Sequence, residues 1–179
     1  MSIMKKLMLA IALAGCGPNA FSGTQWSENR PVYIRITDDV PMPAESIRRS
    51  ITEGLSQFGI SVTSEQAGAY EVSVERDPDC VCSKCGQYTA AWVSPYSFQV
   101  IRVCDRTAVL VKDLGADKAA DVSIKHELGH VLGFDEHLDP GTDVLMSALI
   151  DKRLNVRKFG VADIEAICNA GGVLSKACR

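Results

Sequence analysis

The sequence predicts one domain of the mixed α+β class, in which helices and a sheet pack in layers. Its 179 residues are enough to bury a hydrophobic core, and 46% are hydrophobic and 23% charged, as in most soluble folded proteins. Segments with strand-like alternation and segments with helical spacing follow one another in the order strand, helix, several strands and long helix. This order favours a sheet covered by helices.

The first half of the domain is predicted to supply the sheet and one helix. Residues 31–37 alternate apolar and polar side chains, which indicates a half-buried strand. The Pro-Met-Pro of residues 41–43 suits the start of a helix, and apolar residues then recur at helical spacing until Gly59 ends it. Further strands are expected at residues 60–63, 70–75, 88–93 and 98–103, the last two joined by a turn at residues 94–96.

The second half of the domain is predicted to be mainly helical. Asp117 is expected to cap a long helix that ends at Gly133. A turn-rich stretch follows, and a last short helix is expected at residues 161–170, before two glycines. The folded domain is therefore predicted to span residues 31–179.

The N-terminus resembles the signal peptide of a bacterial lipoprotein. Lys5 and Lys6 precede a short apolar run at residues 7–14, which is too short to cross a bilayer as a helix. The following Leu-Ala-Gly-Cys resembles a lipobox, in which the chain is cut before the cysteine and the thiol carries lipid. We therefore expect loss of residues 1–15, lipidation of Cys16, a tether at residues 16–30 and anchoring to a membrane of the bacterial cell envelope, at the periplasmic face or the cell surface. The alternative is a plain secretory signal with a chance cysteine.

Six further cysteines are predicted to form disulfides, because an even number in an exported domain is typical of them. Cys168 and Cys178 are close in sequence and form a natural pair. The other four would make two bridges of undetermined connectivity: Cys80, Cys82, Cys85 and Cys104. A structural zinc site is the alternative, because two of these four have ligand-like C-x-x-C spacing.

The charge of the chain gives no sign of a nucleic-acid partner. The formal net charge is −3, and the sequence contains no basic run and no stripe of basic and aromatic residues. We expect a monomer.

The chemistry is concentrated in His126-Glu127-Leu128-Gly129-His130, an H-E-x-x-H motif. Residues four apart lie on one face of a helix, so His126 and His130 can bind one metal ion. Glu127 points to the same side and is placed to accept a proton from a metal-bound water, whose pKa zinc lowers to about 7. The alternative is an ordinary amphipathic helix. Against it, Gly133 allows a sharp turn out of the helix, and all three histidines of the chain fall within residues 126–137.

Residues 126–137 resemble the long zinc signature of metzincins, H-E-x-x-H-x-x-G-x-x-H, and are most similar to the matrixin branch. Residues 143–147 resemble the Met-turn, whose Met146 would form an apolar floor under the metal, and residues 161–167 resemble the matrixin C-terminal helix. The resemblance implies a zinc (Zn²⁺) endopeptidase acting on peptide or protein substrates. It implies a zincin-like fold: a twisted, mostly parallel sheet with an antiparallel edge strand, an active-site helix and a C-terminal helix. The edge strand, expected at residues 88–93, would pair with an extended substrate.

One position departs from the signature. The third ligand is expected three residues after Gly133, where Glu136 stands, and His137 follows one residue later. We expect His137 to bind zinc, because the family uses three imidazoles and a turn absorbs one extra residue. Glu136 is the alternative, since it keeps the spacing and offers a carboxylate oxygen. Two other functions are possible for the chain: a non-catalytic zinc-binding lipoprotein of the same fold, and a metal or redox protein built on the clustered cysteines.

Overall fold

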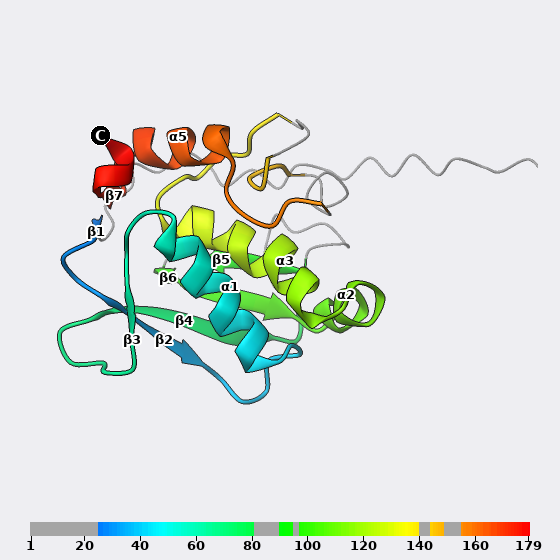
Figure 1. Cartoon of the computed structure of the whole chain (residues 1–179). Helices are drawn as coiled ribbons and strands as arrows, with labels where there is room; N and C mark the ends of the chain where they lie inside the picture. Colours follow the sequence, from blue (N-terminus) through cyan, green and yellow to red (C-terminus); the bar gives the residue numbers. More distant parts are fainter. Residues whose placement is uncertain (1–24, 81–89, 95–96, 140–143, 149–154) are drawn as a thin grey trace, which may run out of the picture.

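The centre of the molecule is a five-stranded sheet in the order β3-β2-β4-β6-β5 (Figure 1). This computed structural model describes residues 25–80, 90–94, 97–139, 144–148 and 155–179. The four parallel strands are β2 (Val32–Ile36), β3 (Val62–Thr63), β4 (Tyr70–Asp77) and β6 (Ser97–Cys104). The fifth strand, β5 (Ala91–Ser94), is antiparallel to β6 and lies at the edge of the sheet. The expected mostly parallel sheet with an antiparallel edge strand is confirmed, whereas pairing of β5 with a substrate stays a prediction.

Helices α1 (Ala44–Ser56) and α3 (Ala116–Val131) pack against each other on one face of this sheet (Figure 1). The apolar side chains of α1 that recur at helical spacing, Ile47, Ile51 and Leu55, are fully buried in the core. Two residues past the helical cap, Gly59 has a φ of 71°, a conformation that favours glycine and turns the chain back toward the sheet. The layered α/β class and the predicted helix are confirmed.

The start of α3 differs from the prediction. Gly115, with a φ of 81°, is the N-cap residue, and no side chain caps the helix. Asp117 lies inside the first turn, where its carboxylate accepts hydrogen bonds from Ser46 (2.8 Å) and Arg49 (3.3 Å) of α1. The expectation that Asp117 caps α3 was therefore wrong, because its Oδ1 atom accepts hydrogen bonds from α1 instead.

A helix that was not expected, α2 (Thr107–Leu114), directly precedes α3. Its start is fixed by the buried Thr107, whose hydroxyl donates to the carbonyl oxygen of Ala90 at 2.5 Å. Three of its eight residues are β-branched, which weakens the helical signal in the sequence. Its packing on α3 then supports the helix.

The two ends of the described chain meet in a small parallel sheet of β1 (Trp26–Ser27) and β7 (Val173–Leu174). β7 follows the C-terminal helix α5 (Val161–Asn169), which confirms the helix expected at residues 161–170. Trp26 lies within the expected tether, yet it is 1% exposed and its Nε1–H donates to the carbonyl oxygen of Val131 at 2.9 Å. The packed structure therefore includes Trp26. This residue joins the C-terminal strand β7 and the last residue of α3.

Two disulfides link described cysteines. The predicted pair of Cys168 and Cys178 is confirmed, and it joins α5 to the short helix η1 (Lys176–Cys178). Cys80 is bonded to Cys104, at the end of β6. Cys82, Cys85 and Cys16 lie outside the described residues. Within the described ranges, every helix is too short or too polar to cross a bilayer.

Candidate metal centre

The site is built on the second half of α3, where the helix is buried on every side. His126 and His130 are 3% and 6% exposed, and they are one helical turn apart on the same face. The helix ends at Val131, one residue after His130, and Gly133, with a φ of 107°, turns the chain sharply. This turn leads the chain back past the two histidines.

Three imidazoles meet at this turn. The ring centroids of His126, His130 and His137 are 4.9, 5.0 and 5.2 Å apart, and one ligand atom from each ring lies within 4.8 Å of the others. The Nε2 atoms of His126 and His137 are 3.3 Å apart. Glu136 is exposed and is not part of this group, which is the only such cluster among the residues that the structure describes.

Backbone carbonyls fix the orientation of two of the rings. Nδ1 of His126 lies 2.8 Å from the carbonyl oxygen of Leu145, and Nδ1 of His130 lies 2.6 Å from that of Phe134. A carbonyl oxygen only accepts, so each Nδ1 carries the hydrogen, and Nε2 of each neutral ring keeps its lone pair. Metal-binding histidines typically have this arrangement. Three imidazoles that each bring one nitrogen within 4.8 Å of the others fit a divalent ion such as zinc.

Carboxylates lie close to the three rings. Glu127 is 7% exposed, and its Oε1 is 4.0 Å from Nε2 of His126. The two acidic residues before His137 are less buried than Glu127: Glu136 is exposed and Asp135 is half-buried. Burial, together with the charge of Glu136, raises the pKa of the Asp135 carboxyl above its usual range. Of these three acids, only Glu127 is buried.

Met146 lies against the helix between the first two histidines. It is fully buried, and a Cβ added to Gly129 would overlap its Sδ and lie 2.8 Å from its Cε. The absence of a side chain at Gly129 therefore lets the Met146 side chain pack directly on the backbone of α3. This is a close apolar contact one residue before His130.

Asp163 of α5 holds the segment that carries Met146. Its fully buried carboxylate accepts hydrogen bonds from the backbone N–H groups of Leu145 (2.9 Å), Met146 (2.8 Å) and Gly160 (2.9 Å). It thereby fixes the Leu145 carbonyl, which is the partner of His126. This role of Asp163 was not predicted. The sequence near Asp163 shows only an acidic residue in the first turn of a predicted helix. Nothing local indicates that it binds the backbone of Leu145 and Met146, which lie 18 and 17 residues away.

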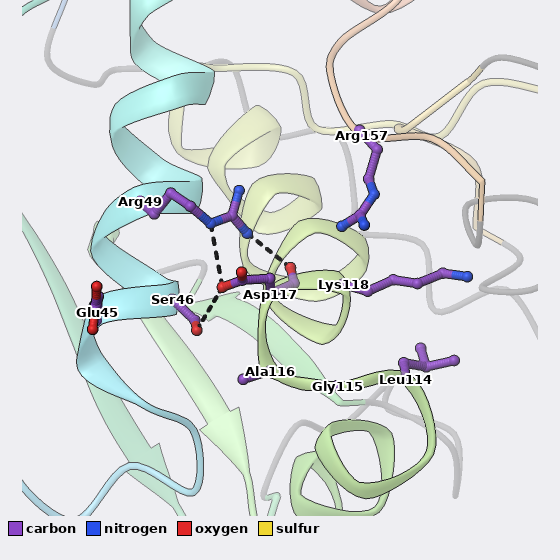
Figure 2. A pocket seen from close by; sticks show the side chains of 9 residues that line it. All are labelled: Glu45, Ser46, Arg49, Leu114, Gly115, Ala116, Asp117, Lys118 and Arg157. Atoms are coloured by element: carbon purple, nitrogen blue, oxygen red, sulfur yellow. Dashed lines mark hydrogen bonds and ion pairs between the residues drawn. The ribbon is translucent and has the colours of Figure 1, made fainter.

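A polar hollow of about 590 Å³ lies near the other end of α3, beside the start of α1 (Figure 2). It is lined by side chains that include Glu45, Arg49, Asp117, Lys118 and Arg157. None of the three histidines lines it. This hollow is therefore separate from the metal centre, from which residue 118 is about 12 Å away along the helix.

No family model and no curated protein matches the sequence. The fold is similar to the crystal structure of a zinc-dependent peptidase from Methanocorpusculum labreanum (strain Z), with a TM-score of 0.50 and 14% sequence identity. The alignment covers 76% of this chain and 99% of that chain. A likeness at this identity establishes the fold, so the expected zinc-peptidase type of fold is confirmed.

Proposed function

We propose that this chain is a zinc-dependent endopeptidase of the matrixin-like metzincin type. The observation that carries this proposal is the convergence of His126, His130 and His137, with the Nδ1 atoms of the first two held by carbonyl oxygens. The likeness to a zinc-dependent peptidase supports it independently, because that comparison rests on the course of the backbone over 76% of this chain.

The residues of the site have two roles, metal binding and proton transfer. His126, His130 and His137 hold the metal, and exposed Glu136 does not. Zinc, when bound, polarises the scissile carbonyl and lowers the pKa of a coordinated water to about 7. Glu127 would accept a proton from the water that attacks the carbonyl carbon and pass that proton to the leaving amine. Its burial beside His126 supports this role, since a carboxylate screened from bulk water acts on a neighbouring group.

The role of Glu127 is tested by Glu127→Ala in the full-length protein. We expect the variant to retain zinc and to lose peptide cleavage by roughly 10²- to 10⁴-fold, the usual contribution of a general base. Cleavage of a mixed peptide library is followed by mass spectrometry with and without a zinc chelator, and metal content is measured by atomic emission. Glu165→Ala, at an exposed position on α5, is the matched control and should cleave as the wild type does.

Two results would contradict the proposal. If Glu127→Ala cleaves as well as the wild type, the assignment of the base is wrong. If the zinc-loaded wild type cleaves no peptide in the library, the chain is a zinc-binding protein without peptidase activity. The disulfide between Cys80 and Cys104 disfavours a redox function that needs these two thiols free.

We further propose that Cys16 carries a lipid that holds the enzyme on a membrane of the bacterial cell envelope. The support is the Leu-Ala-Gly-Cys sequence that follows a short apolar run. In a bacterial host, Cys16→Ala should move the protein from the membrane fraction to the soluble fraction, as judged by immunoblotting after centrifugation. A wild-type protein that is already soluble would refute the anchor.

A further inference from the structure

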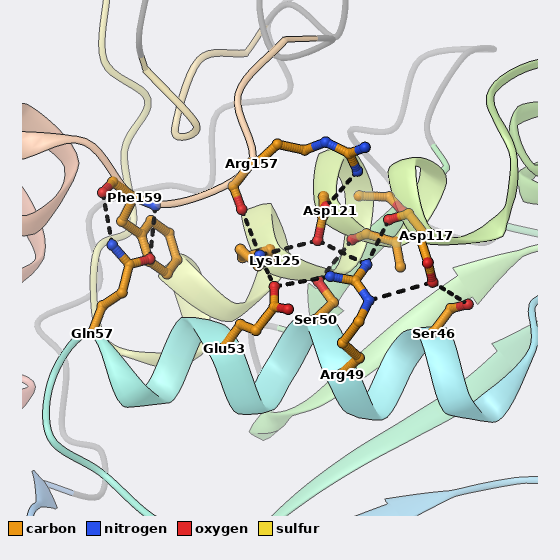
Figure 3. A network of polar contacts seen from close by, with 12 residues as sticks. Ser46, Arg49, Ser50, Glu53, Gln57, Asp117, Asp121, Lys125, Arg157 and Phe159 are labelled. Carbon is orange, nitrogen blue, oxygen red and sulfur yellow. Dashed lines mark hydrogen bonds and ion pairs between the residues drawn. The ribbon is translucent and has the colours of Figure 1, made fainter.

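Lys125, the residue before the first histidine, is completely buried. Its Nζ donates hydrogen bonds to Glu53 Oε2 at 3.1 Å and to the backbone carbonyl of Arg157 at 2.6 Å, and it forms an ion pair with Asp121 Oδ1 at 3.0 Å (Figure 3). An ammonium group has three hydrogens, and three oxygens lie within 3.1 Å of it here. The side chain is therefore fully satisfied without contacting the metal centre.

Lys125 has a second buried charge beside it, the carboxylate of Asp121, whereas Glu53 and Arg157 are exposed. Asp121 is 1% exposed, and its carboxylate also accepts from Arg49 (3.2 Å) and from Arg157 (2.8 Å). Moving such groups out of water is costly, and apolar residues of similar volume often give equal or greater stability. The buried pair of Lys125 and Asp121 is therefore better explained by the geometry that it fixes than by its contribution to stability.

The network fixes the segment that leads into α5. Arg157 is held twice, through its carbonyl by Lys125 and through its guanidinium by Asp121. Two residues later, Phe159 exchanges two backbone hydrogen bonds of 2.9 Å with the side-chain amide of Gln57, which follows α1 (Figure 3). Residues 157–159 are thus fastened to both helices that cover the sheet.

From this segment, hydrogen bonds lead back to the metal centre. Gly160 donates to Asp163, Asp163 accepts from Leu145, and the carbonyl of Leu145 accepts from Nδ1 of His126. This series of contacts therefore begins at Lys125 and ends at His126, the next residue of α3. Displacement of residues 157–159 would move Asp163 and, with it, the carbonyl that orients His126.

We propose that Lys125 is a positioning residue for the metal centre: by anchoring residues 157–159 it sets the Leu145 carbonyl that orients the His126 imidazole. His130 is a built-in reference, because its Nδ1 partner, the carbonyl of Phe134, belongs to the turn after α3 and lies outside this series. The inference rests on the proposed function only in taking His126 as a metal ligand.

The test uses Lys125→Met in the metal-free protein, with imidazole nitrogens observed by ¹⁵N–¹H NMR. We expect the His126 signals to change from one tautomer, with hydrogen on Nδ1, to a mixture, while the His130 signals stay as in the wild type. Zinc affinity, measured by competition with a chromophoric chelator, should fall roughly 10- to 100-fold, as when other contacts that orient metal ligands are lost.

A second variant covers the case in which Lys125→Met does not fold. Gln57→Ala removes the two hydrogen bonds to Phe159 without leaving a buried charge unpaired, and it should shift the same His126 signals to a smaller extent. Ser50→Ala is the matched control, because Ser50 joins α1 to α3 by donating to the carbonyl of Ala120 (3.2 Å) and makes none of the contacts that link Lys125 to His126. It should leave both histidines unchanged.

The outcomes are separable. If folded Lys125→Met and Gln57→Ala both keep the wild-type His126 signals and zinc affinity, the proposal is wrong. If His126 and His130 change together, and do so in Ser50→Ala as well, the network is only structural and the proposal is again wrong. A wild type that binds zinc but cleaves no peptide would refute the peptidase function and leave the positioning role of Lys125 intact.

Discussion

The proposed third metal ligand is either Glu136 or His137, and the position of each side chain depends on the chain after the turn at Gly133. Gly133 donates to the carbonyl of His130 at 3.0 Å, which ties the start of the turn to α3. Leu138 donates to the carbonyl of Met146 at 2.9 Å, which ties its end to the segment under the helix. Between these two anchors the imidazole of His137 lies with the other two rings, and Glu136 is exposed.

We predict that His137→Ala lowers zinc affinity by more than the roughly 10- to 100-fold typical of a contact that only orients a ligand, because a direct donor is lost. Glu136→Ala removes an exposed carboxylate and should leave the affinity within about twofold of the wild type. Competition with a chromophoric chelator gives both values. The reverse order, with Glu136→Ala the weaker binder, would assign the third ligand to the carboxylate.

Helices and strands with a pattern of their own could be predicted from the sequence, whereas pairing between distant segments could not. β2, β4 and α1 follow from alternation or helical spacing, since each such pattern is contained within the element itself. The two-residue strands β1 and β7 have no such pattern, because each exists through its pairing with the far end of the chain. The role of Asp163 could not be predicted for the same reason, because its carboxylate accepts hydrogen bonds from backbone N–H groups of another segment.

The pairing of β1 with β7 bears directly on the end of α3. Gly172, one residue before β7, accepts a hydrogen bond from the backbone N–H of Trp26 at 2.8 Å. A Cβ at Gly172 would overlap the carbonyl oxygen of Leu132 and lie 3.1 Å from the Cα of Gly133. The backbone of the C-terminal segment is therefore in contact with the turn that carries the chain toward His137.

We predict that Gly172→Ala lowers the free energy of unfolding by about 1–3 kcal/mol, since a methyl group here meets backbone atoms that cannot move aside as a side chain can. Zinc affinity should fall with it, because the turn at Gly133 is displaced. Urea unfolding and zinc competition measure the two effects. Ala170→Ser, a similarly small addition at an exposed position of the same segment, should change neither quantity. Equal stability of the two variants would show that the contact at Gly172 is loose.

For the whole molecule, the class of fold and the three histidines were predictable because the signals are local. The H-E-x-x-H spacing places two imidazoles on one helix face, and Gly133 indicates the turn that brings the third. The ion network around Lys125 was not predictable, since Glu53 and Arg157 lie 72 and 32 residues from it in sequence. Such a network requires the tertiary structure before any of its members can be paired.

Ion pairs on the surface and between the helices also set how the molecule responds to acid. A hydrogen bond from Arg35 lowers the pKa of the Glu71 carboxyl, and one from Ser46, with the charge of Arg49, lowers that of Asp117. Burial opposes ionisation of Glu53, but hydrogen bonds from Lys125 and Arg49 outweigh it and lower its pKa as well. These three carboxylates are therefore held in the charged form by the folded state.

The sign of the resulting pH dependence follows from linkage. Because the pKa values are lower in the folded state, the unfolded chain binds more protons in the acid range, and the stabilisation is complete only above the unfolded values of 4.5 for Glu and 3.8 for Asp. We predict that the free energy of unfolding declines as pH falls below about 4.5 and through the lowered folded values. Urea unfolding of the metal-free protein at pH 7, 4 and 3 measures this decline. Arg35→Met removes the partner of Glu71 and should make the decline shallower. An unchanged slope in that variant would mean that solvent already screens the pair, as happens at many exposed sites.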